Sequence, residues 1–342
     1  MKNGYKRFHD LTIDIGEEPK RIVALVGANG CGKSSVLDGI LYHHGAHEAI
    51  GNKGGKDHNY HSMTRSPTVS YQNVVIEFSD GTFNEKREAL KALGASNTMF
   101  SFRSPYRYNS ALKVKETRAT AEIRLNNYGA TTSSDIDDKM EQNYRRVHIM
   151  FNKFLKENPG TATYDSARTK ILGDINTSLK QCLDLEIVSI GDIGDDKGTF
   201  FFKKTDHPNE FEFDVLSSCE KEVVDILLDL YLRQDAYSDS VFLIDEPELH
   251  INTAIQRKLL IEINKLVGTN CQIWIATHSI GFLRALQDQF KDDCQIIKFS
   301  NGVNWASAPQ VLTPMKKTAS VMSRVYRRIN SCIFLHNQPK ED

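Results

Sequence analysis

The stretch ALVGANGCGKSSVLDG, residues 24–39, decides the fold class. An apolar run leads into a glycine-rich loop, and the residues after the loop have the composition of a helix. Glycines let the backbone N–H groups curl around a phosphate, and the helix N-terminus that follows favours anions. The pattern G-x4-G-K-S is that of a phosphate-binding loop. We therefore predict that the loop binds a nucleotide through the following residues: Asn29, Gly30, Cys31, Gly32, Lys33, Ser34 and Ser35.

The end of this loop and one later strand supply the predicted chemistry. We expect the Lys33 ammonium to reach the terminal phosphates and the Ser34 hydroxyl to ligate Mg²⁺. The run VFLID, 241–245, reads as a buried strand that ends in Asp245 and Glu246. Two acids there are costly unless they face a cation or a ligand. Asp245 is expected to hold the magnesium ion, and Glu246 to polarise the attacking water.

Two further motifs are ambiguous when each is taken alone. In LSSCEK, 216–221, Ser217 and Glu220 form a capping box, which either provides an anion site at a helix N-terminus or simply caps a helix. In ATHS, 276–279, His278 follows an apolar strand at the edge where sheets bind ligands, although a lone histidine is more often structural.

The order of these motifs along the chain resembles that of the ATPase heads of the ABC class. The phosphate loop comes first, followed by the capped helix, the strand that ends in Asp-Glu and the strand that ends in His. This class includes transporter subunits, SMC and RecF-like repair proteins, and the overcoming-lysogenization-defect (OLD) family. IDEPELHIN and ATHS are most similar to OLD-like and RecF-like ATPases of bacterial defence and repair, whereas the DEPTSALD of transporter subunits is absent. The resemblance covers about residues 5–80 and 210–300.

The resemblance implies an α/β fold with a mostly parallel sheet, an N-terminal antiparallel β lobe and a helical insertion. It implies ATP and Mg²⁺ as cofactors and a head-to-tail homodimer or higher oligomer that encloses the nucleotides between heads. Glu246 would be the general base, His278 the γ-phosphate sensor and Ser217 the contact from the partner head. Tyr5 and Phe8 are candidates for the adenine contact.

The signature motif departs from the family pattern at Cys219, where the family usually has glycine. A cysteine there either is a tolerated small residue or brings a side chain close to the γ-phosphate. Because helix N-termini lower thiol pKa values, this position favours a thiolate, which would repel the phosphate; the alternative is that Cys219 only crowds the site. The glutamine loop of the family is not placed by the sequence, and Gln72, at the start of an expected strand, is a candidate.

Alternating strands and helices favour a parallel sheet with helices on both faces. We predict an ABC-type head from residues 1–88 and 185–310, a helical insertion at 89–184, and a basic C-terminal helix and tail at 311–342. Within the insertion, apolar residues spaced by three and four predict two helices that form a hairpin. YQNVVIEF-SDG-TFNEKRE, 71–88, predicts a β-hairpin, and residues 90–135 are predicted to be irregular.

Three segments have more than one reading. The five histidines between positions 43 and 61 indicate either a metal site or a polar loop near the nucleotide. FRSPYRYNSALKVK, 102–115, mixes basic and aromatic residues, which suits nucleic acid or a protein interface. PMKKTASVMSRVYRRIN, 314–330, has the pattern of a basic amphipathic helix, which either docks on the domain or binds a membrane, nucleic acid or a partner.

Bulk properties limit the class of protein. The 342 residues carry a formal net charge of −1 and contain no apolar run of membrane-spanning length. Six scattered cysteines and no secretory signal predict a cytoplasmic protein with no membrane contact. The insertion, about 30–35 Å long at 1.5 Å per residue, is too short for an SMC arm.

About 60 residues follow His278, too few for the nuclease domain of the OLD family. We therefore predict an ATPase that acts as a sensor or scaffold and controls a separate effector, a nuclease or a toxin, in bacterial antiviral defence. The alternative is a RecF-like repair ATPase that binds duplex DNA, and a transporter ATPase subunit fits less well.

Overall fold

The computed structural model describes residues 1–48, 62–63, 69–105, 112–114, 136–193, 197–300 and 305–315. The chain divides into two compact units, each described here by itself. The sheet unit comprises residues 1–104, 239–247 and 271–342, and the helical unit comprises residues 105–238 and 248–270. Within the described ranges, no helix is long and apolar enough to cross a membrane. The head and insertion boundaries predicted from the sequence stay a prediction.

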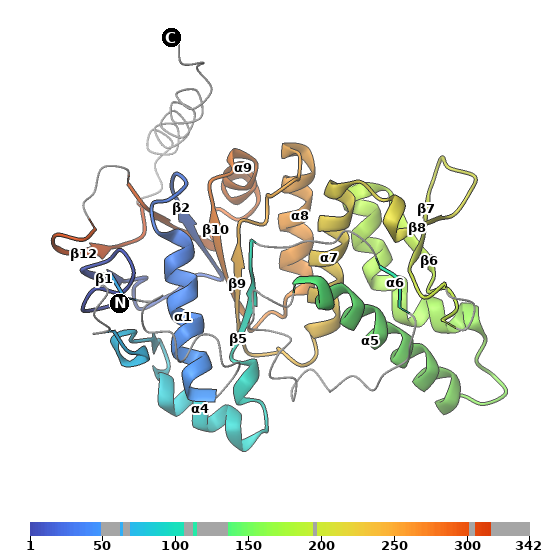
Figure 1. The fold of residues 1–342 in the computed structure, drawn as a ribbon, viewed down its shortest axis with the longest axis horizontal. Coiled ribbons are helices and arrows are strands. Elements are labelled where there is room, and N and C mark those ends of the chain that lie inside the picture. The colour runs from blue at the N-terminus through green and yellow to red at the C-terminus, as the bar shows by residue number, and fades with distance from the viewer. Residues whose placement is uncertain are drawn as a thin grey trace, which may run out of the picture. The chain divides into compact units, whose positions relative to one another are not determined.

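A five-stranded sheet in the order β11-β2-β10-β9-β5 forms the centre of the sheet unit, and every neighbouring pair is parallel (Figure 1). All residues of β2 are buried, as expected for an apolar strand with both faces covered. The predicted mostly parallel sheet is thus confirmed. Its strands are β2 (Ile22–Val26), β5 (Phe100–Arg103), β9 (Val241–Asp245), β10 (Gln272–Thr277) and β11 (Cys294–Lys298).

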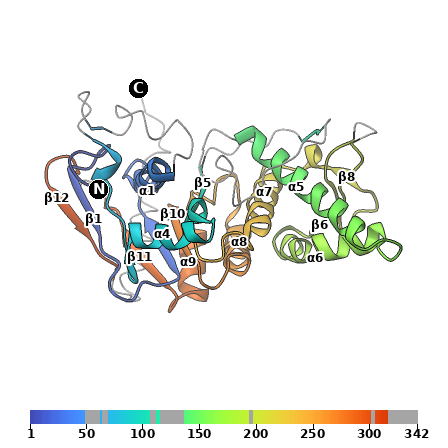
Figure 2. The ribbon, with the colours of Figure 1, turned by 90° about the horizontal axis from the view of Figure 1, so that it is seen from below.

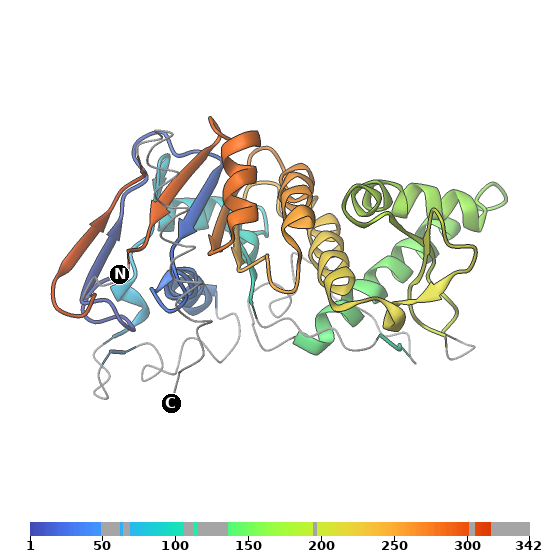
Figure 3. The same ribbon diagram turned by 90° about the horizontal axis from the view of Figure 1, so that it is seen from above.

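Helices cover both faces of this sheet, with α1 (Lys33–Glu48) and α9 (Ile280–Gln289) on opposite sides (Figures 2 and 3). Of the predicted N-terminal antiparallel lobe, the described residues show the short pair β3 (Glu77–Phe78) with β4 (Gly81–Thr82) and single antiparallel bridges from Tyr5 to Phe8 and Ser62. The other small pair, β1 (Asp10–Ile13) with β12 (Pro309–Leu312), is parallel. The described residues of this unit also form 3₁₀ turns at Tyr71–Asn73 and Ser96–Thr98.

Two local predictions in this unit are wrong. TFNEKRE was expected to be a strand, but all except its first residue belongs to helix α4 (Phe83–Ala92). The reason is a capping box: the Thr82 hydroxyl accepts from the Glu85 N–H at 3.3 Å, and the Glu85 carboxylate accepts from the Thr82 N–H at 2.7 Å. The stretch expected to be irregular contains β5, whose four residues are buried against β9.

The described part of the helical unit combines four helices with a small antiparallel sheet. The helices are α5 (Ile136–Glu157), α6 (Tyr164–Leu183), α7 (Ser218–Arg233) and α8 (Thr253–Leu266). The sheet, in the order β6-β7-β8, comprises β6 (Leu185–Ser189), β7 (Phe201–Lys204) and β8 (Phe211–Glu212), and a 3₁₀ turn at Phe213–Val215 leads into α7. The predicted hairpin of α5 and α6 is present, and most of its apolar stripe is buried, at Met140, Tyr144, Val147, Phe151, Ile171, Ile175 and Leu179.

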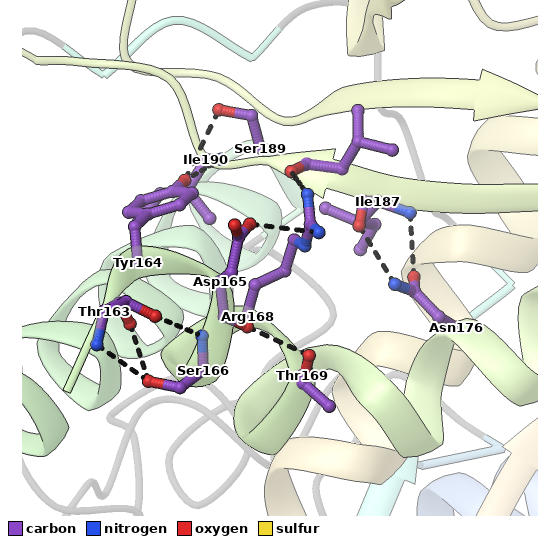
Figure 4. A network of polar contacts seen from close by, with 11 residues as sticks. Thr163, Tyr164, Asp165, Ser166, Arg168, Thr169, Asn176, Ile187, Ser189 and Ile190 are labelled. Carbon is purple, nitrogen blue, oxygen red and sulfur yellow. Dashed lines mark hydrogen bonds and ion pairs between the residues drawn. The ribbon is translucent and has the colours of Figure 1, made fainter. Parts of the chain in front are cut away.

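Side chains of α6 close the outer edge of β6 (Figure 4). The Asn176 amide donates to the Ile187 carbonyl at 2.9 Å and accepts from the Ile187 N–H at 2.8 Å. Arg168 donates to the Val188 carbonyl at 3.4 Å, and the Tyr164 hydroxyl accepts from the Ile190 N–H at 3.2 Å. The edge strand therefore presents few backbone groups to another chain, a common protection for edge strands.

We expect Asn176→Ala to destabilise the helical unit by about 1–3 kcal/mol, because it leaves both Ile187 backbone groups without their partner. Hydrogen exchange at the Ile187 amide should become faster, and urea unfolding should shift to lower concentration. Thr177→Ala is the control, since the Thr177 hydroxyl bonds only its own helix, at the Gly173 carbonyl. Equal exchange at Ile187 in both variants would contradict the role given to Asn176.

Candidate functional site

The glycine-rich loop between β2 and α1 has the bent backbone expected of a phosphate-binding loop. Gly30 has φ +76° and Gly32 φ +110°, a region that L-residues rarely adopt. The Lys33 ammonium donates to the Gly27 carbonyl at 2.9 Å and the Ala28 carbonyl at 3.1 Å, and Lys33 is 3% exposed. Asn29, Gly30 and Ser34 are exposed, whereas the following loop residues are buried: Cys31, Gly32 and Ser35.

Ser34 and Asp245 meet although they are far apart in the sequence. The Ser34 Oγ lies 3.1 Å from Asp245 Oδ1 and donates to it. Asp245 is 2% exposed, at the end of β9. A hydroxyl and a buried carboxylate are oxygen ligands of the kind that Mg²⁺ takes beside a nucleotide phosphate. The pair therefore fits the magnesium site predicted from the sequence.

The strand register explains why the motifs converge. Val26 lies opposite Thr277, and Ala276 lies opposite Asp245. The phosphate loop, His278 and Glu246 therefore leave three neighbouring strands, β2, β10 and β9, at the same edge of the sheet. The carboxyl edge of a parallel sheet is where such folds bind ligands.

Glu246 and His278 face each other at this edge. Glu246 Oε1 lies 3.5 Å from His278 Nδ1, and the two side chains are 19% and 31% exposed, so both are partly buried and partly accessible. Glu246 has φ +46°, rare for a non-glycine residue, and its N–H donates to the Ala276 carbonyl at 2.8 Å. Ser279 directly after His278 caps α9, and this fixes the chain beside the histidine.

The predicted signature residues Ser217 and Cys219 lie in the helical unit, at the N-terminus of α7. The capping box is present: the Ser217 hydroxyl accepts from the Glu220 N–H at 3.4 Å, and the Glu220 carboxylate accepts from the Ser217 N–H at 2.8 Å. Burial tends to raise the pKa of Glu220, but hydrogen bonds from Lys204 and Ser217 outweigh burial and leave the pKa below its usual value. Glu220 is thus an anion that occupies this helix N-terminus.

Of the two hypotheses for Cys219, the one that needs a thiolate is wrong. Burial raises the pKa of the Cys219 thiol, and the nearby carboxylates of Glu220 and Glu222 raise it further. A backbone hydrogen bond from Asn252 acts in the opposite direction but does not reverse the shift. The thiol is therefore protonated at neutral pH, so Cys219 can crowd a neighbouring group but does not repel it by charge.

The adenine candidates are also wrong. Tyr5 and Phe8 are both fully buried. The Tyr5 hydroxyl donates to Asp38 at 2.8 Å, and the Phe8 ring packs edge-on against Trp305 with centroids 5.8 Å apart. Neither ring presents a face on which a base could stack. Gln72 is exposed in the 3₁₀ turn Tyr71–Asn73 rather than at the start of a strand.

The ambiguous segments resolve only in part. His43 and His44 are buried in α1, with ring nitrogens 2.9 Å from the Tyr71 carbonyl and 3.1 Å from the Ser96 carbonyl. Among the side chains that the structure describes, no cluster of three or more acids, histidines or cysteines fits a metal. Several of the residues in question lie outside the described part of the chain: His58, His61, Tyr106, Arg107 and Tyr108. The same is true of the helix predicted at 314–330, of which only the first two positions are described.

Arg7 lies at the loop, although the sequence patterns did not single it out. Its Nη1 donates to the carbonyl of Gly30, at the exposed tip of the loop. The first strand of the chain, β1, begins at Asp10, so Arg7 lies in a turn before it, where no periodicity indicates which way a side chain points.

Comparison with known proteins places this site in a family. Solved structures with similar folds include an SMC head domain from Thermotoga maritima (12% identity, TM-score 0.45, 92% of this chain and 97% of that one). Another is an SMC head bound to the ScpA C-terminal domain derived from Pyrococcus furiosus (13%, 0.44, 92% and 94%). No curated protein sequence matches the chain. The sequence model described as "AAA domain, putative AbiEii toxin, Type IV TA system" matches residues 22–284, more than half of the chain, so the protein belongs to this AAA-domain family of P-loop ATPases.

Proposed function

We propose that the protein binds Mg²⁺-ATP at the β2–α1 loop and hydrolyses it. The observation that carries the proposal is the meeting of Ser34, Asp245, Glu246 and His278 at one sheet edge beside Lys33. The loop carbonyls that hold the Lys33 ammonium are weaker acceptors than phosphate, so Lys33 is available to bind the terminal phosphates. Ser34 and Asp245 would hold Mg²⁺, which neutralises phosphate charge when bound.

Glu246 is the candidate general base in this proposal. Its carboxylate is open to water and can accept a proton from the attacking molecule. His278, whose Nδ1 lies 3.5 Å from Glu246 Oε1, would act as the γ-phosphate sensor beside that carboxylate. Two variants test this part of the proposal. ATP turnover should slow in Glu246→Gln, and nucleotide affinity should fall in Lys33→Ala.

We further propose that ATP pairs two copies of the head and that the paired state controls a separate effector in antiviral defence. The family description, which names a toxin of a type IV toxin–antitoxin system, supports a defence role. Ser217 is exposed at the capped N-terminus of α7, so one head can present this surface to the nucleotide of the other head. Pull-down from a native host with the Glu246→Gln protein in ATP or ADP, followed by mass spectrometry, tests the effector. The same proteins in both nucleotides would contradict nucleotide control.

Cys219→Gly is expected to strengthen ATP-driven pairing and to speed hydrolysis. A neutral thiol acts by crowding, and relief of overpacking is worth about 1–3 kcal/mol, so pairing affinity should rise at least roughly fivefold. Because the thiol is protonated, wild-type pairing should not fall between pH 7 and 8. Light scattering at several protein concentrations measures both effects.

Cys219→Ala is the matched control, since it removes the thiol and keeps the Cβ. An effect confined to the glycine variant assigns the crowding to the Cβ, and an effect shared by both assigns it to sulfur. Unchanged pairing and turnover in both variants would show that Cys219 is a tolerated small residue.

A further inference from the structure

The segment around Arg7 is fixed in place by its neighbours. Phe8 packs under the phosphate loop: a Cβ added to Gly32 would lie 2.6 Å from the Phe8 ring. Trp305 packs against Phe8, and the Trp305 carbonyl accepts from the His9 N–H at 2.7 Å. The Tyr5 hydroxyl donates a hydrogen bond to the Asp38 carboxylate. With Tyr5 and Phe8 buried on either side of it, Arg7 is directed outward along the loop.

The Arg7 side chain lies over the two glycines that shape the loop. Its Cδ would be 3.0 Å from a Cβ added to Gly32, and its Nη1 donates to the Gly30 carbonyl. The residue is exposed, and no described carboxylate forms an ion pair with it. The adjacent Lys6 differs, because its ammonium is 2.7 Å from Asp38.

A guanidinium carries five N–H donors, so one carbonyl leaves most of its capacity unused. Phosphate oxygens are stronger acceptors than a carbonyl, and the planar fork of arginine matches their geometry. Lys33 is the positive side chain within the loop itself, and a triphosphate carries several negative charges. A second cation at the loop tip therefore has an evident partner once a nucleotide is bound.

We propose that Arg7 is a phosphate-binding residue of the nucleotide site, which exchanges the Gly30 carbonyl for the phosphates of the bound nucleotide. The inference rests on the proposed ATP binding. The competing explanation is that Arg7 only holds the tip of the loop. The two explanations differ in salt dependence, because a contact to phosphate weakens with ionic strength and a contact to a carbonyl does so far less.

The test measures the affinity of the purified full chain for Mg²⁺-ATP by equilibrium binding, at about 50 and 300 mM NaCl, with tripolyphosphate as a competitor that has no base. Variants are Arg7→Gln and Arg7→Lys, with Lys91→Gln as control. Lys91 is an exposed lysine of α4 in the same unit, paired only loosely with Glu88 at 3.8 Å. Thermal unfolding checks that each variant folds.

We expect Arg7→Gln to bind ATP roughly tenfold more weakly at low salt, the loss of one charge-assisted bond. Its affinity should depend less on salt than that of the wild type, and tripolyphosphate should lose affinity in parallel. Arg7→Lys should recover part of the affinity, and Lys91→Gln should match the wild type.

Wild-type affinity in Arg7→Gln would overturn the inference while leaving the proposed ATP binding intact. Weaker ATP binding with an unchanged salt dependence and unchanged tripolyphosphate competition would also overturn it, in favour of the structural role. A folded wild type that binds no ATP would overturn the proposed function and this inference with it.

Discussion

Glu246→Gln is expected to bind ATP with wild-type affinity and to hydrolyse it about 10²–10⁴-fold more slowly. The amide keeps the size of the side chain but cannot take the proton from water. Lys33, Ser34 and Asp245, which we assign to binding, are untouched by the change. The measurement is phosphate release at saturating Mg²⁺-ATP, with nucleotide affinity determined on the same protein.

Glu88→Gln is the matched control, since Glu88 is an exposed acid of α4 in the same unit. It should turn over ATP at the wild-type rate. Wild-type turnover in Glu246→Gln would show that Glu246 is not the general base and that another group takes the proton from water. A loss of ATP affinity in Glu246→Gln would instead place Glu246 among the binding residues.

Lys33→Ala is expected to weaken ATP binding by about 3 kcal/mol, roughly a hundredfold, because a buried ammonium aimed into the loop is lost. The fold should survive, since alanine leaves no buried charge and frees only the Gly27 and Ala28 carbonyls. Equilibrium binding with Mg²⁺-ATP measures the effect, and thermal unfolding checks the fold.

Lys91→Ala controls for the loss of one positive charge in the same unit and should leave the affinity unchanged. If Lys33→Ala bound ATP as tightly as the wild type, the loop would not be the nucleotide site, whatever its geometry.

Three strands of the central sheet were predictable because their local sequence is typical of buried strands. β2, β9 and β10 are apolar runs that end in polar motifs, and parallel pairing brings such ends to one edge. The Ser34–Asp245 pair follows from that topology. The sequence could not supply the register that places Ala276 opposite Asp245, which depends on pairing between distant segments.

Other elements depended on contacts that no local pattern reveals. β5 is four residues long and is defined by pairing with β9, far along the chain. At the turn signal SDG, the short antiparallel pair of β3 and β4 does form, but the capping box of Thr82 and Glu85 starts α4 directly after it, so the second strand ends at Thr82. At Cys219, the helix N-terminus was the visible local effect, whereas burial and the carboxylates of Glu220 and Glu222, which raise the pKa of the thiol, depend on the surrounding fold.

The central claim is that ATP, and not ADP, joins two heads. Light scattering of the Glu246→Gln protein with Mg²⁺-ATP, with Mg²⁺-ADP and without nucleotide tests it most directly, because this variant should hold ATP uncleaved. We predict that the mass doubles or rises further with ATP alone, and that adding Lys33→Ala to the variant abolishes the rise. Equal mass in all three conditions would contradict a head that ATP switches between single and paired states.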